Sequence, residues 1–246
     1  MASQQSFRRR ELKYMLTVEQ KARVLSAMEP YMVPDRYGKS TVRNLYFDTD
    51  SYLLIRRSME KPIYKEKLRL RSYARTSADS TVFAEIKKKY KKTVYKRRVS
   101  MGEGEATAWL SGARHCAATG QIVREIDYFL SFYGNLHPTV YLCYDREAFF
   151  SREDDSFRVT FDDRILCRTE ELTLDSEPYG TPILEEGKVL MEIKCAGGMP
   201  LWMTEILSRE KLYKTSFSKY GTAYQKFIFP NHKEELKNGS TVSGIV

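Results

Sequence analysis

Residues 63–73 read IYKEKLRLRSY, and residues 82–89 read VFAEIKKK. In both stretches polar and apolar side chains alternate, which is the period of a β-strand with one buried face. Alternate residues share a face, so Glu85 projects on the same side as Lys87. Four basic side chains of the first stretch also share one face: Lys65, Lys67, Arg69 and Arg71. The two stretches therefore predict neighbouring strands that carry a row of cations.

The same alternation recurs along the chain. We expect eight strands, over residues 8–15, 41–48, 63–73, 82–89, 93–101, 139–150, 157–163 and 189–195. Helical spacing of apolar residues predicts four helices, over residues 17–29, 121–132, 201–211 and 218–227. The first helix opens with a Thr-x-x-Gln capping box. Eight strands joined mostly by short turns favour an antiparallel sheet or barrel over parallel units, so the fold class is mainly β (α+β) with helices packed outside.

Composition limits the size of the fold and the kind of partner. A chain of 246 residues with 42% hydrophobic residues can bury a sizeable core, which excludes a disordered or fibrous protein. We expect one domain over residues 1–229 and a polar, loose tail over residues 230–246. The net charge of +9 favours an anionic partner: nucleic acid, an acidic membrane surface or a small polyanion. No signal peptide or membrane-length apolar run is present, and the four scattered cysteines fit a reducing compartment, so we expect a cytoplasmic protein.

Several common catalytic motifs are missing. Three histidines in unrelated contexts and no CxxC pair make a transition-metal site improbable, so any metal should have oxygen ligands. The run from Gly38 to Thr41 reads GKST like the end of a P-loop, but Val33 stands where that motif needs its first glycine. Asp48-Thr49-Asp50 follows a strand, and we interpret it as a turn with Asx-type hydrogen bonds. Neither HExxH nor GxSxG occurs.

The charged strand faces have two interpretations. Each could be the solvated face of an ordinary amphipathic strand, but like charges about 6.8 Å apart along a strand repel unless an anion lies among them. Glu11, Glu85 and Glu192 each stand two residues before a lysine. If these faces converge inside a closed barrel, they form a cationic lumen with a few carboxylates. Such a lumen would bind phosphate oxygens through its cations and a hard divalent metal through its glutamates.

Nine short motifs occur in order between residues 7 and 228: ELKY, YFDTDSYLL, KLRLRSY, FAEIKKK, VYKRR, YDREAF, FRVTFDDR, VLMEIK and SFSKY. Together they resemble the polyphosphate polymerase domain of the vacuolar transporter chaperone (VTC) family, which belongs to the triphosphate tunnel (CYTH-like) metalloenzymes. The resemblance implies a closed, eight-stranded antiparallel β-barrel that forms a tunnel, with a short C-terminal helix. It also implies a lumen that binds a nucleoside triphosphate and Mn²⁺ or Mg²⁺.

The resemblance implies a role for individual residues. It places the catalytic phosphate-binding cations at Lys13, Arg69, Arg71, Lys87, Arg146 and Arg158. It places substrate-binding residues at Lys96, Tyr144, Ser218 and Lys219, to which Lys67 and Lys194 are added because they share strand faces with assigned residues. Tyr144 would stack on a nucleotide base, or it is a core tyrosine. Glu192 would be the metal carboxylate, with Glu11 and Glu85 as further candidates. The wider superfamily opens with Glu-x-Glu-x-Lys, whereas this chain has Arg9 at the first of these positions.

The favoured function is transfer of the γ-phosphate of ATP to a growing inorganic polyphosphate chain, whose terminal phosphate is an anionic nucleophile and needs no general base. A tunnel triphosphatase is an alternative, in which Glu11 or Glu85 would orient water. A module that binds polyphosphate or nucleotide without turnover is another. Nucleic-acid binding is not expected, because glutamates interrupt the basic faces. The expected partners are ATP and inorganic polyphosphate or triphosphate, with a separate membrane or sensor subunit left open.

Overall fold

A computed structural model of the chain describes residues 10–91, 93–154 and 156–230. The predicted loose tail falls, apart from Pro230, outside the described residues. The strands are β1 (Arg10–Thr17), β2 (Met32–Asp48), β3 (Tyr64–Ser72), β4 (Thr81–Tyr90), β5 (Thr93–Gly102), β6 (His137–Ser151), β7 (Arg158–Arg168), β8 (Thr181–Pro182), β9 (Lys188–Cys195) and β10 (Lys214–Thr215). The helices are α1 (Val18–Met28), α2 (Leu53–Met59), α3 (Glu103–Leu110), α4 (Gln121–Tyr133), α5 (Leu201–Arg209), α6 (Lys219–Ala223) and a π-helix (Tyr224–Ile228).

All strand pairs are antiparallel, which confirms the predicted mainly-β antiparallel class. The sheet has ten strands in the order β10-β1-β9-β7-β6-β2-β3-β4-β5, with β8 attached to β7. The prediction of eight strands closed into a barrel is not what the strand pairing shows. Within the described residues β5 pairs only with β4, and β10 pairs with β1 at Lys13 and Tyr14. Because β10 occupies that edge of β1, the edge is not paired with β5.

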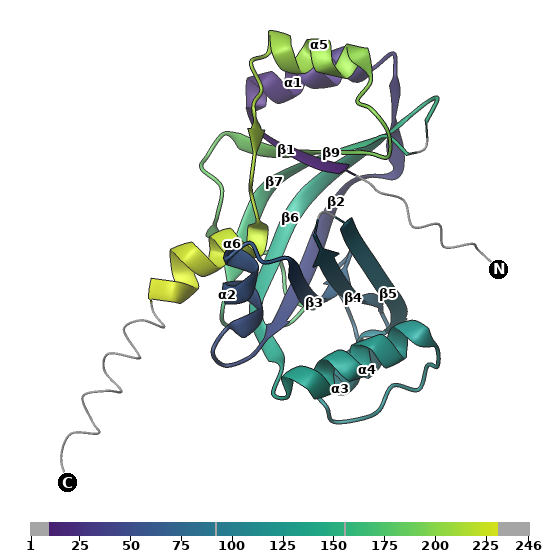
Figure 1. The fold of residues 1–246 in the computed structure, drawn as a ribbon, viewed down its shortest axis with the longest axis vertical. Coiled ribbons are helices and arrows are strands. Elements are labelled where there is room, and N and C mark those ends of the chain that lie inside the picture. Colours follow the sequence, from purple (N-terminus) through teal and green to yellow (C-terminus); the bar gives the residue numbers. More distant parts are fainter. Residues whose placement is uncertain (1–9, 92, 155, 231–246) are drawn as a thin grey trace.

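The sheet nevertheless curls strongly on itself (Figure 1). β1 and β4 are separated by β9, β7, β6, β2 and β3 in the sheet order, yet the Glu11 carboxylate lies 3.6 Å from the Lys87 ammonium. Side chains on one face of the sheet therefore approach one another from both of its ends. We call the face that carries these two residues the inner face, and the opposite face the outer face.

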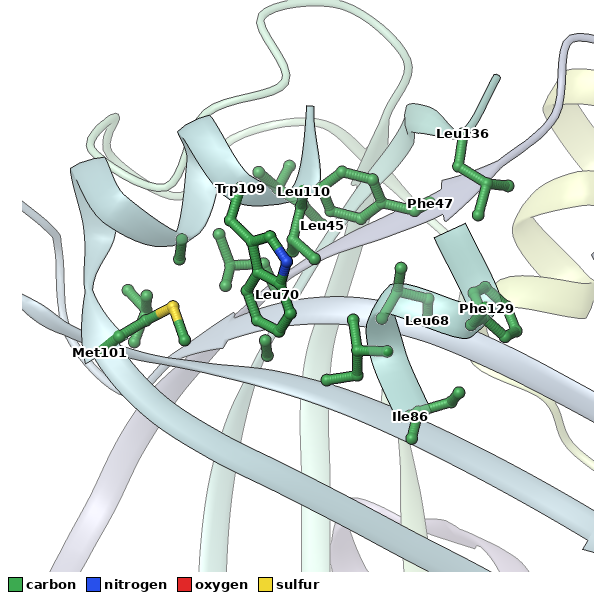
Figure 2. Close-up of a cluster of buried hydrophobic side chains, with 14 of the residues drawn as sticks. Leu45, Phe47, Leu68, Leu70, Ile86, Met101, Trp109, Leu110, Phe129 and Leu136 are labelled. Atoms are coloured by element: carbon green, nitrogen blue, oxygen red, sulfur yellow. The ribbon is translucent and has the colours of Figure 1, made fainter. Parts of the chain in front are cut away.

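Two hydrophobic clusters cover the outer face. α1 and α5 pack over β1, β9 and β7 through a cluster that includes Val24, Met203 and Phe161. α3 and α4 pack over β3 and β4 around Trp109, which is 2% exposed and lies among apolar side chains such as Leu70 and Leu110 (Figure 2). The Trp109 indole N–H donates a hydrogen bond of 2.7 Å to an Asp127 carboxylate oxygen, so its one polar atom is satisfied. This packing fixes the curvature of the sheet and leaves the inner face for polar residues.

The inner face has an apolar part and a charged part. Its apolar part buries Val42, Val140 and Leu142 against Tyr220 and Tyr224 of α6 and the π-helix. The C-terminal helix was predicted, but it does not pack on the outer face with α1, α3, α4 and α5: it covers one end of the inner face. This placement brings Lys219, the first residue of α6, next to the charged part.

Helix caps and turns that are encoded in short stretches of sequence account for other parts of the structure. The Thr17–Gln20 capping box is present in both directions, at 3.2 and 2.9 Å. The Asp48 carboxylate accepts hydrogen bonds from the backbone of Thr49 and of the first turns of α2, which confirms the predicted turn. α2 and α3 were not predicted, because seven or eight residues are too short to show helical periodicity. None of the helices in the described ranges is long and apolar enough to cross a membrane.

Candidate active site

One group of charged side chains surrounds Glu85 of β4, which is 1% exposed. Arg69 of β3 donates to one carboxylate oxygen from Nε and Nη2, at 2.8 and 2.6 Å. Lys96 of β5 lies 2.6 Å from the other oxygen, and Arg71 lies 3.9 Å from the oxygen that Arg69 contacts. We call these four residues the Glu85 cluster. It contains three cations and one carboxylate, so it keeps a net positive charge.

A second group brings together residues that are distant in the sequence. Arg146 of β6 forms a bidentate pair with Asp162 of β7, at 2.6 and 2.7 Å. Lys219 of α6 lies 2.5 Å from Asp162 and 3.3 Å from Glu192 of β9. Lys13 of β1 also lies 3.3 Å from Glu192. These five residues form the Asp162–Glu192 cluster, in which three cations face two carboxylates.

Tyr144 joins the two clusters. Its hydroxyl accepts a hydrogen bond of 3.2 Å from Arg71 of the Glu85 cluster. Its ring lies beneath Lys219 and Arg146, whose charged groups are 4.5 and 5.1 Å from the ring centroid. The side chain is 3% exposed. Tyr144 thus has the environment of a core tyrosine, with one ring face occupied by cations, and it holds the cations of both clusters in a fixed relation.

The other predicted site residues lie around these clusters. Glu11 contacts Lys13 at 3.5 Å as well as Lys87 at 3.6 Å, so it links β1 to β4 across the inner face. Arg158, four residues before Asp162 on β7, stacks on the Phe150 ring at 3.9 Å and lies 3.9 Å from Asp35. Ser218 uses its hydroxyl as the N-cap of α6, accepting from the Gly221 N–H at 3.2 Å. Lys67 lies over the ring of Tyr220, 5.5 Å from its centroid.

Residues 8–228 match the model of the VTC domain family. The chain belongs to the VTC domain family. A Bacillus halodurans protein provisionally described as an adenylate cyclase has 15% identity and a TM-score of 0.54, over 90% of this chain and 96% of that one, which shows a shared fold. A similarly described Vibrio parahaemolyticus protein has 11% identity and a TM-score of 0.46, over 89% and 98%. No curated protein sequence matched the chain.

Burial and like charge change the pKa values of several lysines on the inner face of this VTC domain. Burial lowers the pKa of Lys67 to about 8, and the nearby Lys65 and Lys87 ammonium groups act in the same direction. Burial also lowers the pKa of Lys194 to about 8, against the attraction of Glu192. Within the described residues neither lysine forms a salt bridge. In the described part of the chain, both are therefore cations without a salt-bridge partner.

Two carboxyl groups also have lowered pKa values, but the cause is neighbouring cations and not burial. Burial disfavours the charged form of Glu85, but Arg69, Arg71 and Lys96 together hold its pKa well below the usual range. Burial is likewise overcome at Asp162, where Lys219 and Arg146 lower the pKa of the carboxyl. Both groups stay ionised at neutral pH, so the cations around them remain ordered by full negative charges.

Sequence reasoning missed three inner-face residues of the VTC domain. Asp162 shares a strand face with Arg158, but nothing in the sequence shows that two cations converge on it. Asn44 accepts a hydrogen bond of 2.8 Å from Arg71 Nε, and the Tyr46 hydroxyl accepts one of 3.0 Å from Arg69. Both lie on β2, directly opposite these arginines in the register with β3. Strand pairing, once known, would have identified them.

Proposed function

We propose that this VTC domain is a polyphosphate polymerase, which transfers the γ-phosphate of ATP to the end of a growing inorganic polyphosphate chain. The observation that supports this most strongly is the convergence of cations from separate strands and α6 on both sides of Tyr144. Arg69 and Arg71 lie on one side, and Arg146 and Lys219 lie on the other. A row of phosphates needs cations distributed along its length, which one isolated anion site does not provide.

The chemistry fits the groups present. Phosphoryl transfer depends on positioning and on neutralising the charge of the transferred group, which guanidinium and ammonium groups supply. The attacking terminal phosphate of polyphosphate is already an anion, so no histidine or cysteine is required as a base. The carboxylates of Glu85 and Asp162 are held by cations and therefore orient those cations rather than accept protons.

Glu192 and Glu11 are the two carboxylates that we propose for binding a divalent cation. The Lys13 ammonium lies 3.3 Å from the first carboxylate and 3.5 Å from the second, so these two groups are already arranged around one positive charge. No group of three His, Cys, Asp or Glu side chains in the described ranges is placed to hold a metal. We therefore propose that the two glutamates would hold Mn²⁺ or Mg²⁺ together with substrate phosphate oxygens, as is usual for Mg²⁺. The ion would neutralise charge on the bridged phosphates.

The test uses ATP labelled at the γ-phosphate, with Mn²⁺ or Mg²⁺, and gel electrophoresis of the products. The expected result is a ladder of phosphate chains that is lost in Lys87→Ala. Lys88→Ala is the matched control, because Lys88 is the next residue on β4, points to the outer face and lies 3.5 Å from Glu125. It should retain the ladder.

Other products would identify the alternative activities. Labelled orthophosphate without polymer, lost in Lys87→Ala and kept in Lys88→Ala, would make the VTC domain a triphosphatase. Binding of ATP and polyphosphate without any product would make it a binding module. Either result would refute the polymerase proposal.

A further inference from the structure

Asp162 is a fully buried charged group on the inner face, with a side chain that is 0% exposed. A buried carboxylate is unfavourable unless cations and hydrogen bonds compensate its charge. Among the residues that the structure describes, Arg146 and Lys219 are the two that form salt bridges with Asp162. Both are cations that the proposed function assigns to phosphate binding. The carboxylate is thus placed behind the cations, where it contacts them and not solvent.

The contacts of Asp162 connect three parts of the fold. Arg146 is its direct register partner on β6, and it presents Nε and Nη2 to the two carboxylate oxygens at 2.6 and 2.7 Å. This fork geometry fixes the plane of the guanidinium. Lys219 reaches the carboxylate from α6, at 2.5 Å. Asp162 therefore fixes the orientation of one cation and attaches the helix that carries the other.

Glu192 holds the same two cations more loosely. Its carboxylate lies 3.3 Å from Lys219 and 3.8 Å from Arg146, compared with 2.5 and 2.6 Å at Asp162. Glu192 is also the carboxylate proposed to take part in metal binding. When Glu192 is engaged by a cation other than Lys219, Asp162 is the group that keeps Arg146 and Lys219 in place.

We propose that Asp162 is a positioning residue of the VTC domain: it sets the geometry of Arg146 and Lys219 and does not itself touch substrate. This inference rests on the proposed function for the role of those two cations. Under this proposal the two carboxylates of the Asp162–Glu192 cluster have different roles. Asp162 stays bound to Arg146 and Lys219, whereas Glu192 can exchange these residues for another cation.

The test compares Asp162→Asn with Asp163→Asn. Asp163 is the next residue on β7, points to the outer face and lies 3.4 and 3.7 Å from Lys21 and Lys39. Asp162→Asn removes one negative charge beside the substrate, so tripolyphosphate should bind as tightly as in the wild type or more tightly. The kcat for polymer synthesis should fall by about 100-fold, because the cations are misplaced. Asp163→Asn should change neither quantity. A loss of thermal stability in Asp162→Asn with wild-type kcat would overturn the proposal.

If Asp162→Asn does not fold, a second comparison of variants tests the positioning role of Asp162. The double variant Asp162→Asn/Lys219→Met removes one charge of each sign and keeps the cluster's balance. It should turn over more slowly than Lys219→Met alone, because Arg146 has also lost its anchor. Equal rates for these two variants would show that Asp162 only compensates Lys219, and would overturn the positioning role.

One measurement is independent of activity. The Nε–H group of Arg146 should give a sharp NMR signal in the wild type and in Asp163→Asn, and a broadened or shifted signal in Asp162→Asn. An unchanged signal in Asp162→Asn refutes the positioning role, even if the VTC domain makes polymer. If the wild type binds tripolyphosphate but makes no polymer, the proposed function fails while this measurement still tests Asp162.

Discussion

The Glu85 cluster and the Asp162–Glu192 cluster have similar chemistry but are assembled differently. The Glu85 cluster comes from β3, β4 and β5, three consecutive strands of one meander. The Asp162–Glu192 cluster joins β1, β6, β7, β9 and α6. The first has one carboxylate for three cations, whereas the second has two carboxylates for three cations. The comparison indicates that the Glu85 cluster, built from neighbouring strands, has surplus positive charge. The Asp162–Glu192 cluster, built from long-range contacts, is more nearly balanced in charge and more firmly held.

The largest effect should come from removing one guanidinium from either cluster. We expect Arg69→Ala and Arg146→Ala each to reduce kcat/KM for polymer synthesis by about 10²–10³-fold, the range seen when one preorganised donor to a transition state is lost. Similar losses would indicate that both clusters act on the reacting phosphates. A loss confined to one variant would show that the other cluster serves only binding or folding.

Glu85→Gln should distinguish the clusters by stability. It leaves Arg69, Arg71 and Lys96 without their buried counter-charge, so the free energy of unfolding should decrease by about 3 kcal/mol. Tripolyphosphate can replace the lost negative charge, so the ligand should raise the urea midpoint more in Glu85→Gln than in the wild type. Equal midpoint shifts in the two proteins would contradict the view that this cluster has an unfilled anion position.

The pH dependence of binding should reveal the two lysines without fixed partners. Lys67 and Lys194 have pKa values of about 8 in the free protein, because burial disfavours their charge. A bound polyanion raises both pKa values. Below pH 7 the lysines are charged before and after binding, so they add no pH dependence. Above pH 8 binding must take up protons, and affinity should fall by up to about 1.4 kcal/mol per pH unit for each lysine.

Calorimetry at pH 8 in buffers of different ionisation heat measures this proton uptake. Lys67→Met should decrease the uptake, and so should Lys194→Met. The protonation of the ligand itself is the same for all three proteins and cancels in the comparison. Uptake that is equal in the wild type and both variants would show that neither lysine titrates on binding.

The smallest effect is expected on the outer face. Lys21 forms a 2.6 Å pair with Glu147, which is partly exposed. Such pairs contribute up to about 1 kcal/mol, so Lys21→Met should lower the free energy of unfolding by no more than this and leave tripolyphosphate affinity unchanged. Weakened binding in this variant would show that the two faces of the sheet are not independent.

The contrast between the locally built Glu85 cluster and the long-range Asp162–Glu192 cluster also explains how much of the site could be predicted from the sequence. Alternation along single strands placed Lys67, Arg69 and Arg71 on one face, and the next two strands added Glu85 and Lys96. These predictions depend only on strand period and on neighbours in the chain. The resemblance to the VTC family then located Arg146, Glu192 and Lys219.

The remaining features depend on long-range geometry. Asp162 could not be recognised as an anchor, because its partners on β6 and α6 meet it only in the folded sheet. The open order of the strands was also not predictable from alternation, which is the same in a closed barrel and in a curled sheet. The two-residue strand β10, which pairs with β1, has no periodicity at all.

The contact between β1 and the start of α6 has a consequence for the order in which the protein is made. Lys13 donates a hydrogen bond of 2.8 Å to the carbonyl of Phe217, 204 residues further along the chain. Within the described residues the first strand pairs only with β9 and β10, so it has no strand partner until these late segments have been synthesised, and contacts of such long sequence separation form slowly. A nascent chain can display the lysines and arginines of β3 to β5, but not the complete inner face.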